Sequence, residues 1–210
     1  MVINVLAFAT SPRRYGNSET LLDYLLAAMA DEGGVAITRH VLGEDIVINP
    51  CRGCNACEKL GRCIQTGDDL NDVLEEIVEA DCVVLASPIF CMGLCAQAKA
   101  LVDRAQVFRS RKYVRHEPVV PPDRKDKRIG IFVSTAGQKW DIVFDGAVMS
   151  MDCFFHVSDI KKMNMRWLMI DGVDQKGAIE AHPTAREQAR EMGKGVIREL
   201  KELKGEVSGT

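Results

Sequence analysis

The chain has 210 residues, of which 47% are hydrophobic and 27% charged, and its formal net charge is −3. This composition predicts one globular domain over residues 1–210, and it argues against a membrane-spanning protein because no apolar run is long enough. The slightly acidic balance does not indicate a nucleic-acid partner. The first residues lack the basic start of a secretory signal, so we expect a cytoplasmic protein.

The chain begins with a strand pattern. Residues 2–9 are a nearly continuous apolar run broken only by Asn4, which is typical of a strand buried on both faces of a parallel sheet. A polar segment follows, and leucines then recur at helical spacing from Leu21 to Leu26. The order strand, polar loop, helix predicts the first unit of an α/β fold.

The same alternation continues to the end of the chain. We expect further strands within 35–41, 82–86, 128–133 and 157–170. We expect further helices within 70–77, 94–105, 140–155 and 182–203. Strands and helices in this order predict a doubly wound α/β sandwich, in which helices cover both faces of a parallel sheet.

The polar loop after the first strand has the composition of a phosphate site. Ser11, Asn17, Ser18 and Thr20 offer hydroxyl or amide donors, and Arg13 or Arg14 adds a charged one. The free amides at the start of the following helix attract an anion. The loop is neither a Walker loop nor G-x-G-x-x-G. The alternative is that Asn17 and Ser18 only cap the helix.

An inserted loop at 50–67 contains the pattern C-x2-C-x2-C-x5-C, formed by Cys51, Cys54, Cys57 and Cys63. Two-residue spacings let one turning loop direct several thiolates at one centre, as in loops that hold four irons. Gly53 and Gly61 allow the backbone to fold tightly. We interpret the four cysteines as ligands of a [4Fe–4S] cluster. Zinc is the main alternative, although its structural ligands usually form two separated pairs, and free or redox-regulatory thiols are the other.

Two further segments stand out. Residues 87–93 form an apolar loop at the end of a strand, where the loop would pack against a flat aromatic ring of a ligand. The alternative is that Ile89 and Phe90 fold back into the core. Residues 108–127 carry many basic side chains and three prolines, which predicts a long extended excursion. We expect a solvated basic loop, with a lid or an arm around a second subunit as alternatives.

The remaining cysteines and the histidines have no pattern of their own. Cys82, Cys91, Cys95 and Cys153 are predicted to be small buried residues, and for Cys91 the alternative is contact with a ring bound at its loop. The four histidines show no ligand spacing, so they receive no role.

Three loops together resemble a known family. Residues 10–20 resemble the G-S-P-R-x-x-G-N-[ST] loop of NADPH-dependent FMN reductases, with Thr10 in place of its glycine. Residues 87–93 are similar to that family's S-P-x-Y-x-x-x loop, with Phe90 where tyrosine is usual. Lys99, Asp103 and Arg104 match its K-x-x-x-D-R. With the cysteine run, the pattern resembles the iron–sulfur flavoproteins of anaerobic archaea and bacteria, from residue 2 to about 137.

The resemblance implies a flavodoxin-like fold with a five-stranded parallel sheet of order 2-1-3-4-5. It implies a [4Fe–4S] cluster on the four cysteines and a homodimer or homotetramer in which the cluster lies near a neighbouring flavin. It also implies FMN at three loops. The phosphate loop would supply Ser11, Arg13, Asn17, Ser18 and Thr20. The ring would lie between Pro88, Ile89, Phe90, Met92 and Gly93 on one side and Ser134, Thr135, Ala136 and Gly137 on the other.

The function that follows is electron transfer. A ferredoxin-like donor would deliver electrons through the cluster and FMN to a small acceptor such as a quinone, oxygen, peroxide or a flavin. No catalytic side chain is required, because the flavin carries the chemistry. One alternative is an NAD(P)H-dependent FMN or quinone reductase without a functional cluster, with NAD(P)H as substrate. Another is a non-enzymatic flavodoxin-like module whose cysteines bind zinc for interaction.

Overall fold

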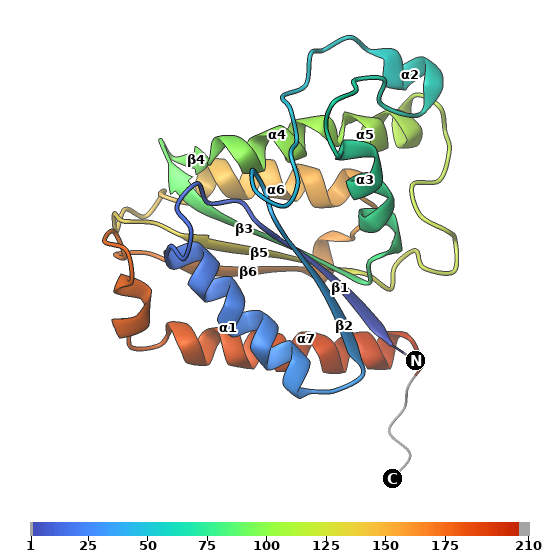
Figure 1. Ribbon diagram of the computed structural model, residues 1–210. Coiled ribbons are helices and arrows are strands. Elements are labelled where there is room, and N and C mark those ends of the chain that lie inside the picture. Colours follow the sequence, from blue (N-terminus) through green and yellow to red (C-terminus); the bar gives the residue numbers. More distant parts are fainter. Residues whose placement is uncertain (1, 206–210) are drawn as a thin grey trace.

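The central sheet matches the predicted order. The computed structural model describes residues 2–205. Five parallel strands lie side by side in the order β2 (Val35–Val41), β1 (Ile3–Ala9), β3 (Cys82–Phe90), β5 (Ile129–Thr135) and β6 (Met165–Ile170) (Figure 1). Counted along the chain, this is the order 2-1-3-4-5, so the flavodoxin-like prediction is confirmed. A short strand that was not predicted, β4 (Gly93–Leu94), pairs antiparallel with the end of β3.

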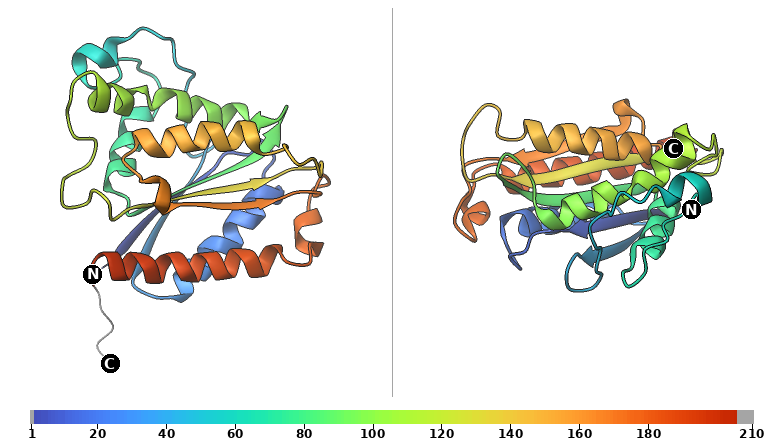
Figure 2. Two further views of the ribbon diagram at one scale, coloured as in Figure 1. Left: turned by 180° about the vertical axis from the view of Figure 1, so that it is seen from behind. Right: turned by 90° about the horizontal axis from the view of Figure 1, so that it is seen from above.

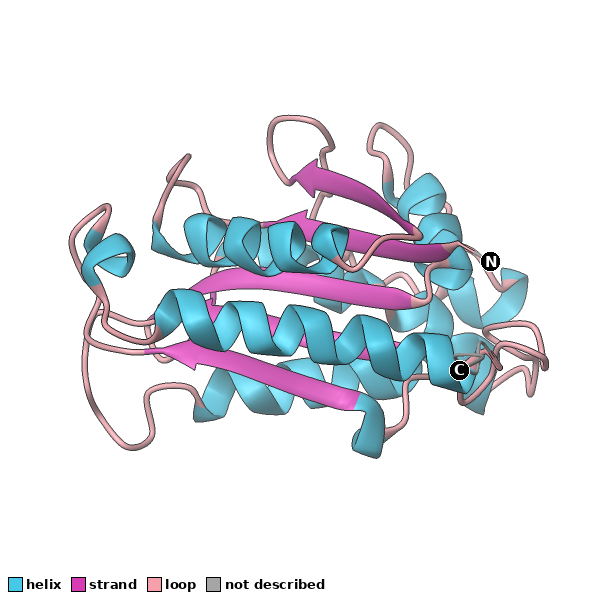
Figure 3. Ribbon diagram, turned by 90° about the horizontal axis from the view of Figure 1, so that it is seen from below, coloured by secondary structure: helices cyan, strands magenta, loops and turns pink. Residues whose placement is uncertain are grey.

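Helices cover both faces of the sheet. One face carries α1 (Asn17–Asp31) and α7 (Ala185–Leu203), which lie across it in Figure 3. The other carries α3 (Leu70–Glu79), α4 (Ala96–Arg104), α5 (Gln106–Tyr113) and α6 (Asp145–Val157) (Figure 2). Three short helices complete the chain: α2 (Ala56–Leu60), η1 (Lys162–Asn164) and η2 (Ala178–Ala181).

Alternate strand residues enter opposite cores, which explains the continuous apolar runs. On β1, Leu6 and Phe8 pack with α3 and α4, whereas Val5 and Ala7 pack with α1 and α7. β3 is divided in the same way. A strand buried on both faces has no solvent side on which polar residues would be favoured.

A glycine allows the two helices of one face to cross closely. A Cβ on Gly193 of α7 would lie 2.7 Å from the carbonyl oxygen of Leu25 in α1. Backbone cannot move aside as a flexible side chain can, so any larger residue would push α7 away from α1.

A buried arginine ties two helices together at the amino-terminal edge of the sheet. Arg128 donates to the carbonyl oxygens of Ala80 (2.9 Å) and Ser158 (2.6 Å) and to that of Ile77. These carbonyls lie at the carboxyl ends of α3 and α6. Burial, together with the nearby Arg124, lowers the pKa of Arg128 to about 10. At this edge the contacts of Arg128 are structural, and the opposite edge carries the pocket described below.

Several boundaries differ from the predictions. The helix expected from residue 140 begins at Asp145, because 140–144 form turns; β6 occupies only the end of 157–170, and α7 begins at Ala185.

The expectation of buried cysteines is confirmed for Cys82 and Cys95 and is wrong for Cys91 and Cys153, which are exposed. Within residues 2–205, no helix combines the length and hydropathy of a membrane span.

Candidate functional site

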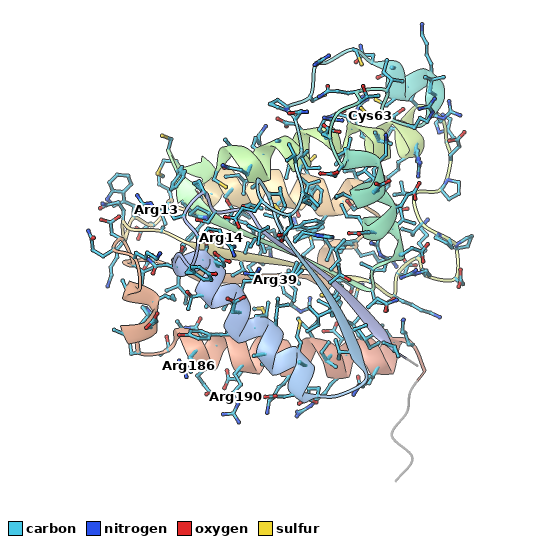
Figure 4. All side chains as sticks on the ribbon, in the orientation of Figure 1. Arg13, Arg14, Arg39, Cys63, Arg186 and Arg190 are labelled. Atoms are coloured by element: carbon cyan, nitrogen blue, oxygen red, sulfur yellow. The ribbon has the colours of Figure 1, made fainter. Side chains whose placement is uncertain are left out.

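The strand ends enclose a pocket of about 290 Å³ on the carboxyl edge of the sheet. We call it the strand-end pocket. Figure 4 labels Arg13 and Arg14 at this edge. Most of the residues predicted to bind a cofactor line the pocket. They are Ser11, Arg13, Asn17, Ser18, Pro88, Ile89, Phe90, Thr135 and Gly137. The topology therefore brings together the three loops that the sequence singled out, while their binding roles stay predictions.

The other predicted residues lie outside the lining. Thr20 is one turn into α1, where its backbone N–H donates to Gly16. Ser134 is buried and donates its hydroxyl to the carbonyl of Ser87 (2.8 Å), and Ala136 is buried beside it. Met92 and Gly93 form the β3–β4 hairpin. These five residues do not line the strand-end pocket, and their binding roles stay predictions.

A buried glutamate holds the loop after β1. Glu19, on the first turn of α1, accepts hydrogen bonds from the backbone N–H of Tyr15 (2.6 Å) and from the side chains of Arg14 (2.5 Å) and Arg39 (2.6 Å). Tyr15 has a φ of +53°, a strained value for a bulky residue, and the glutamate fixes it there. Arg14 is thereby occupied, so Arg13 is the cation that this loop presents to the pocket.

The start of α1 faces the pocket with its backbone. The Asn17 side chain is fully used: it donates to the carbonyls of Val173 and Gln175, both at 2.9 Å, and accepts from the N–H of Ile179 (3.3 Å). It therefore does not cap the helix, whose N-cap is Gly16 without a side-chain bond. The N–H groups of the first turn precede the first intrahelical bond and are available to an anion.

The loop after β6 is a part of the site that sequence reasoning missed. Val173, Asp174 and Lys176 line the pocket, as does Gly16. Asn17 binds this loop to α1, and the loop thereby forms one side of the site. The signal was present in the sequence: Asp171-Gly172-Val173-Asp174 follows a strand directly, as the predicted binding loops do.

A buried polar cluster lies beneath the pocket. The Thr10 hydroxyl donates to the carbonyl of Ala86 (2.7 Å) and lies 3.2 Å from the thiol of Cys95. The Ser87 hydroxyl accepts from the N–H of Cys95 (3.2 Å). Thr10, the departure from the family's glycine, thus bonds β1 to β3 and to the residue that precedes α4.

The cysteine loop, residues 50–67, leaves the sheet through a paired stem. Asp69 donates its N–H to the carbonyl of Val47 (2.9 Å), and its carboxylate accepts from the N–H of Val47 (2.7 Å). Asp68 accepts from the N–H of Asn49 (3.0 Å). Burial alone raises the pKa of the Asp68 carboxyl, but hydrogen bonds from Arg104 and Asn49 outweigh it and leave the pKa below its ordinary value.

The tip of the loop rests on α5. Ser110 donates to the carbonyl of Cys57 (2.8 Å), Arg111 to that of Gly61 (3.0 Å) and Arg115 to that of Lys59 (2.5 Å). Gly61 and Gly53 have φ values of +65° and +63°, which supports the tight folding predicted for them.

The segment at 108–127 differs from its prediction. Its first residues belong to α5 and are helical, and many of its basic groups are paired. Arg115 pairs with Glu117, and Arg124 with Glu79 and Asp81. The prediction of an extended loop is therefore wrong for residues 108–113, which are helical, whereas residues 114–127 contain no helix or strand and are mostly exposed, as expected for a loop.

All four cysteines of the loop line one cavity of about 190 Å³, which we call the cysteine cavity. Cys51 and Cys54 are exposed, and Cys57 and Cys63 are half-buried. Burial raises the pKa of the Cys57 thiol, and the proximity of the other three cysteines raises it further. Figure 4 labels Cys63 on the side of the molecule that carries α4 and α5, away from Arg13.

The composition of the cysteine cavity fits a thiolate-ligated centre. Four soft sulfur donors are accompanied by three guanidinium groups, those of Arg52, Arg104 and Arg109, against the single carboxylate of Glu58. Cations offset the negative charge of a metal–thiolate group. Among residues 2–205, no three His, Cys, Asp or Glu side chains already stand close enough to hold one metal ion.

The chain matches one protein family and several characterised proteins. The model of the NADPH-dependent FMN reductase family matches residues 3–141. An iron–sulfur flavoprotein of Methanocaldococcus jannaschii is 37% identical over 107 residues, 51% of this chain and 54% of that protein. One from Archaeoglobus fulgidus is 30% identical over 138 residues, 63% of this chain and 61% of that protein. The chain thus spans little more than half the length of these relatives.

Solved structures support the fold. An FMN-dependent NADH-azoreductase from Bacillus anthracis, in complex with FMN, superimposes with a TM-score of 0.67 at 15% identity, covering 94% of this chain and 100% of that one. An NAD(P)H:quinone oxidoreductase from Methanothermobacter marburgensis gives 0.65 at 16% identity, covering 93% and 98%.

Proposed function

The chain belongs to the NADPH-dependent FMN reductase family, and from that premise we propose that it is an FMN-dependent oxidoreductase with a [4Fe–4S] cluster on Cys51, Cys54, Cys57 and Cys63. Electrons would pass from a ferredoxin-like donor to a small acceptor such as a quinone, oxygen, peroxide or a flavin. The names of its relatives, which are iron–sulfur flavoproteins, support the cluster.

The observation that carries the proposal is the cysteine cavity. Four thiols from one short loop line a single cavity, and that loop is held at its stem and at its tip by hydrogen bonds from the rest of the protein. A loop with thiols for redox regulation alone would not need four of them around one space. When bound, a cluster supplies one-electron transfer and FMN supplies two-electron chemistry.

The strand-end pocket offers the complementary features for FMN. At one side, Ser11, Arg13 and the first amides of α1 would hold a phosphate by charge and by N–H donors. At the other, Ile89 and Phe90 would pack against an aromatic ring. The chain would bind and orient the flavin, and it would shield one side of the ring from water.

The test is anaerobic purification followed by absorption spectroscopy and analysis of iron, sulfide, zinc and flavin. The proposal expects a brown protein with FMN, about four irons and four sulfides per chain. A yellow protein without iron would overturn the cluster and leave a flavin reductase. A colourless protein with zinc would overturn the oxidoreductase itself.

A second candidate is an NAD(P)H-dependent flavin or quinone reductase in which the cysteines carry no cluster. This candidate is favoured because no residue of the cysteine loop, 50–67, lines the strand-end pocket, so binding in the pocket does not require that loop. A relative from Pseudomonas aeruginosa, an FMN-dependent NADH:quinone oxidoreductase, is 30% identical over 52% of the chain. Steady oxidation of NADH or NADPH by iron-free, FMN-loaded protein would support this candidate.

The proposal includes self-association. Apolar side chains are exposed beside the strand-end pocket and along α6: Phe90 (41%), Trp140 (56%), Ile142 (61%) and Met149 (75%). Monomeric proteins rarely expose apolar groups in one area, so a covered surface is expected here. Analytical ultracentrifugation should show a dimer or tetramer, and a monomer at high concentration would contradict it.

A further inference from the structure

We propose that Arg104 is a positioning residue for the cysteine cavity: it closes the stem of the cysteine loop and hydrogen-bonds the sulfur of Cys63, and so controls how tightly a cluster is held and its reduction potential. The part concerning the cluster rests on the proposed function. The part concerning the stem does not, because it follows from contacts within the protein.

Arg104 reaches away from its own helix. It is the last residue of α4, and its side chain is only 2% exposed. One guanidinium nitrogen donates to the carbonyl of Asn49 (2.7 Å) and to the carboxylate of Asp68 (2.6 Å). The other donates to the Sγ of Cys63 (3.3 Å). Asn49 precedes the four cysteines and Asp68 follows them, so one side chain joins both ends of the loop to one of its thiols.

The local pairing of charges leaves Arg104 free for this role. Lys99 and Asp103, the other charged members of the K-x-x-x-D-R pattern, pair with each other at 2.7 Å on the exposed side of α4. Arg104 finds its counterion in Asp68, which lies in the stem directly after the loop and whose side chain is itself buried. A buried pair loses much of its stability when one partner is removed, because the remaining charge is left uncompensated.

One donor of Arg104 is left without a partner. Its Nε is buried and is the only buried side-chain nitrogen or oxygen in the described part of the chain that makes no hydrogen bond. Such groups are costly and usually indicate a missing acceptor. Arg104 lines the cysteine cavity, where thiolate and sulfide sulfurs of a bound cluster accept hydrogen bonds. The cost of this unpaired N–H is offset by the hydrogen bonds of the other two guanidinium nitrogens to Asn49, Asp68 and Cys63.

The planar fork of arginine suits this set of acceptors. Lysine keeps the charge but is a single point donor on a flexible stem, so it cannot serve a carbonyl, a carboxylate and a sulfur at fixed angles. Arg104→Lys thus separates geometry from charge. Arg109 provides the matched control, because it also lines the cysteine cavity but is exposed and pairs only with Glu58 at 3.3 Å.

The test compares wild type, Arg104→Lys and Arg109→Lys in two states. In metal-free protein, hydrogen–deuterium exchange of residues 47–70 should be faster in Arg104→Lys than in the other two. In anaerobically purified protein, a chelator should remove iron more readily from Arg104→Lys, in line with an affinity about 10- to 100-fold lower. Its cluster should also have a more negative reduction potential, because a hydrogen bond to sulfur stabilises the reduced state.

The two proposals fail in distinguishable ways. Wild type without iron and sulfide overturns the cluster, while the exchange measurement still tests the stem. A wild type that holds a cluster, with an Arg104→Lys variant that matches Arg109→Lys in potential and iron retention, overturns the role of Arg104. Unchanged exchange in metal-free Arg104→Lys overturns the closure of the stem.

Discussion

The strand-end pocket and the cysteine cavity are held in different ways. Around the pocket, the parallel strands deliver their loops to one edge of the sheet, and most positioning contacts run between backbone groups or within a loop and its own helix. Around the cysteine cavity, no strand is involved. The loop is positioned by side chains from elsewhere, chiefly Arg104 on α4 and Ser110 and Arg111 on α5.

This difference predicts how each region responds to change. A pocket built by the topology of a sheet persists as long as the sheet folds, and single substitutions of its lining residues mainly alter affinity. Asn17, whose side chain ties the loop after β6 to α1, is the exception. The position of a loop that is held by a few side chains depends strongly on each of those side chains. The predictions below test that contrast, from the largest expected effect to the smallest.

Cys54→Ser should remove the cluster and leave the flavin. The hydroxyl is a poor replacement for a soft thiolate ligand, whereas the strand-end pocket shares no residue with the cysteine cavity. Iron content should fall to near zero with bound FMN unchanged, as measured by metal analysis and flavin absorbance. Cys153→Ser, at an exposed position outside the loop, is the control, and joint loss of iron and FMN would contradict the separation of the two regions.

Asn17→Ala should be the most damaging change at the strand-end pocket. It removes three hydrogen bonds that tie the loop after β6 to α1, and it leaves the N–H of Ile179 without its partner. We expect a loss of about 2–3 kcal/mol in the free energy of unfolding, measured with urea. FMN affinity should also fall while iron content stays the same. Ser150→Ala, on the exposed side of α6, provides the comparison.

Acid should weaken the cysteine loop through Asp68. Its pKa lies below the ordinary value of 3.8 when folded, so its contribution to stability is complete above that value. That contribution is lost as the pH falls through the folded pKa. The free energy of unfolding of wild type should therefore decline in that range, and the decline should be smaller in Asp68→Asn. Equal declines in the two proteins would rule out this carboxylate as the cause.

Ser110→Ala should loosen only the tip of the loop. The hydroxyl is buried and donates to the carbonyl of Cys57, so its loss should cost about 1 kcal/mol. Hydrogen exchange should increase in 56–61 and not in the stem. Iron retention should decrease less than in Arg104→Lys, and an equal or larger decrease would mean that the tip controls the site.

Lys176→Met should have the smallest effect. The lysine lines the strand-end pocket but makes no salt bridge within residues 2–205, and its ammonium lies 5.9 Å from the centre of the Tyr15 ring. Removing one partly exposed cation near a phosphate should weaken FMN binding by about 1 kcal/mol or less, roughly fivefold. Riboflavin binding, which lacks the phosphate, should not change. A titration of both ligands by fluorescence measures the difference.

Much of the fold could be predicted because its signals are local. The apolar runs of β1 and β3, the leucines of α1 and the spacing of the four cysteines depend only on neighbouring residues in the chain. In open α/β sheets, ligands bind beyond the carboxyl ends of the strands, and this rule predicted that three loops lie together. The same rule applied to β6 would have added Val173 to Lys176, but no sequence motif drew attention to that loop.

The errors came from contacts between distant residues. The basic run at 108 is charged enough to suggest a solvated loop, but residues 108–113 belong to α5, and Arg111, Arg115 and Arg124 bind carbonyls of the cysteine loop or a carboxylate of α3. Asn17 has the sequence features of a cap or a phosphate donor, and only the position of the loop after β6 shows what its side chain binds.

The sequence by itself determined the alternation of strands and helices and the four cysteines on one loop, because both are encoded in short-range patterns of apolar residues or in spacing. The sheet order was an expectation from the family resemblance. Only the tertiary structure decided that Arg104 leaves α4 for the cysteine loop, that Asp68 is its counterion, and that Cys91 and Cys153 are exposed. The physical reason is that burial and hydrogen bonding depend on which distant segments meet, and residues 36 positions apart, such as Asp68 and Arg104, have no signal in the local sequence.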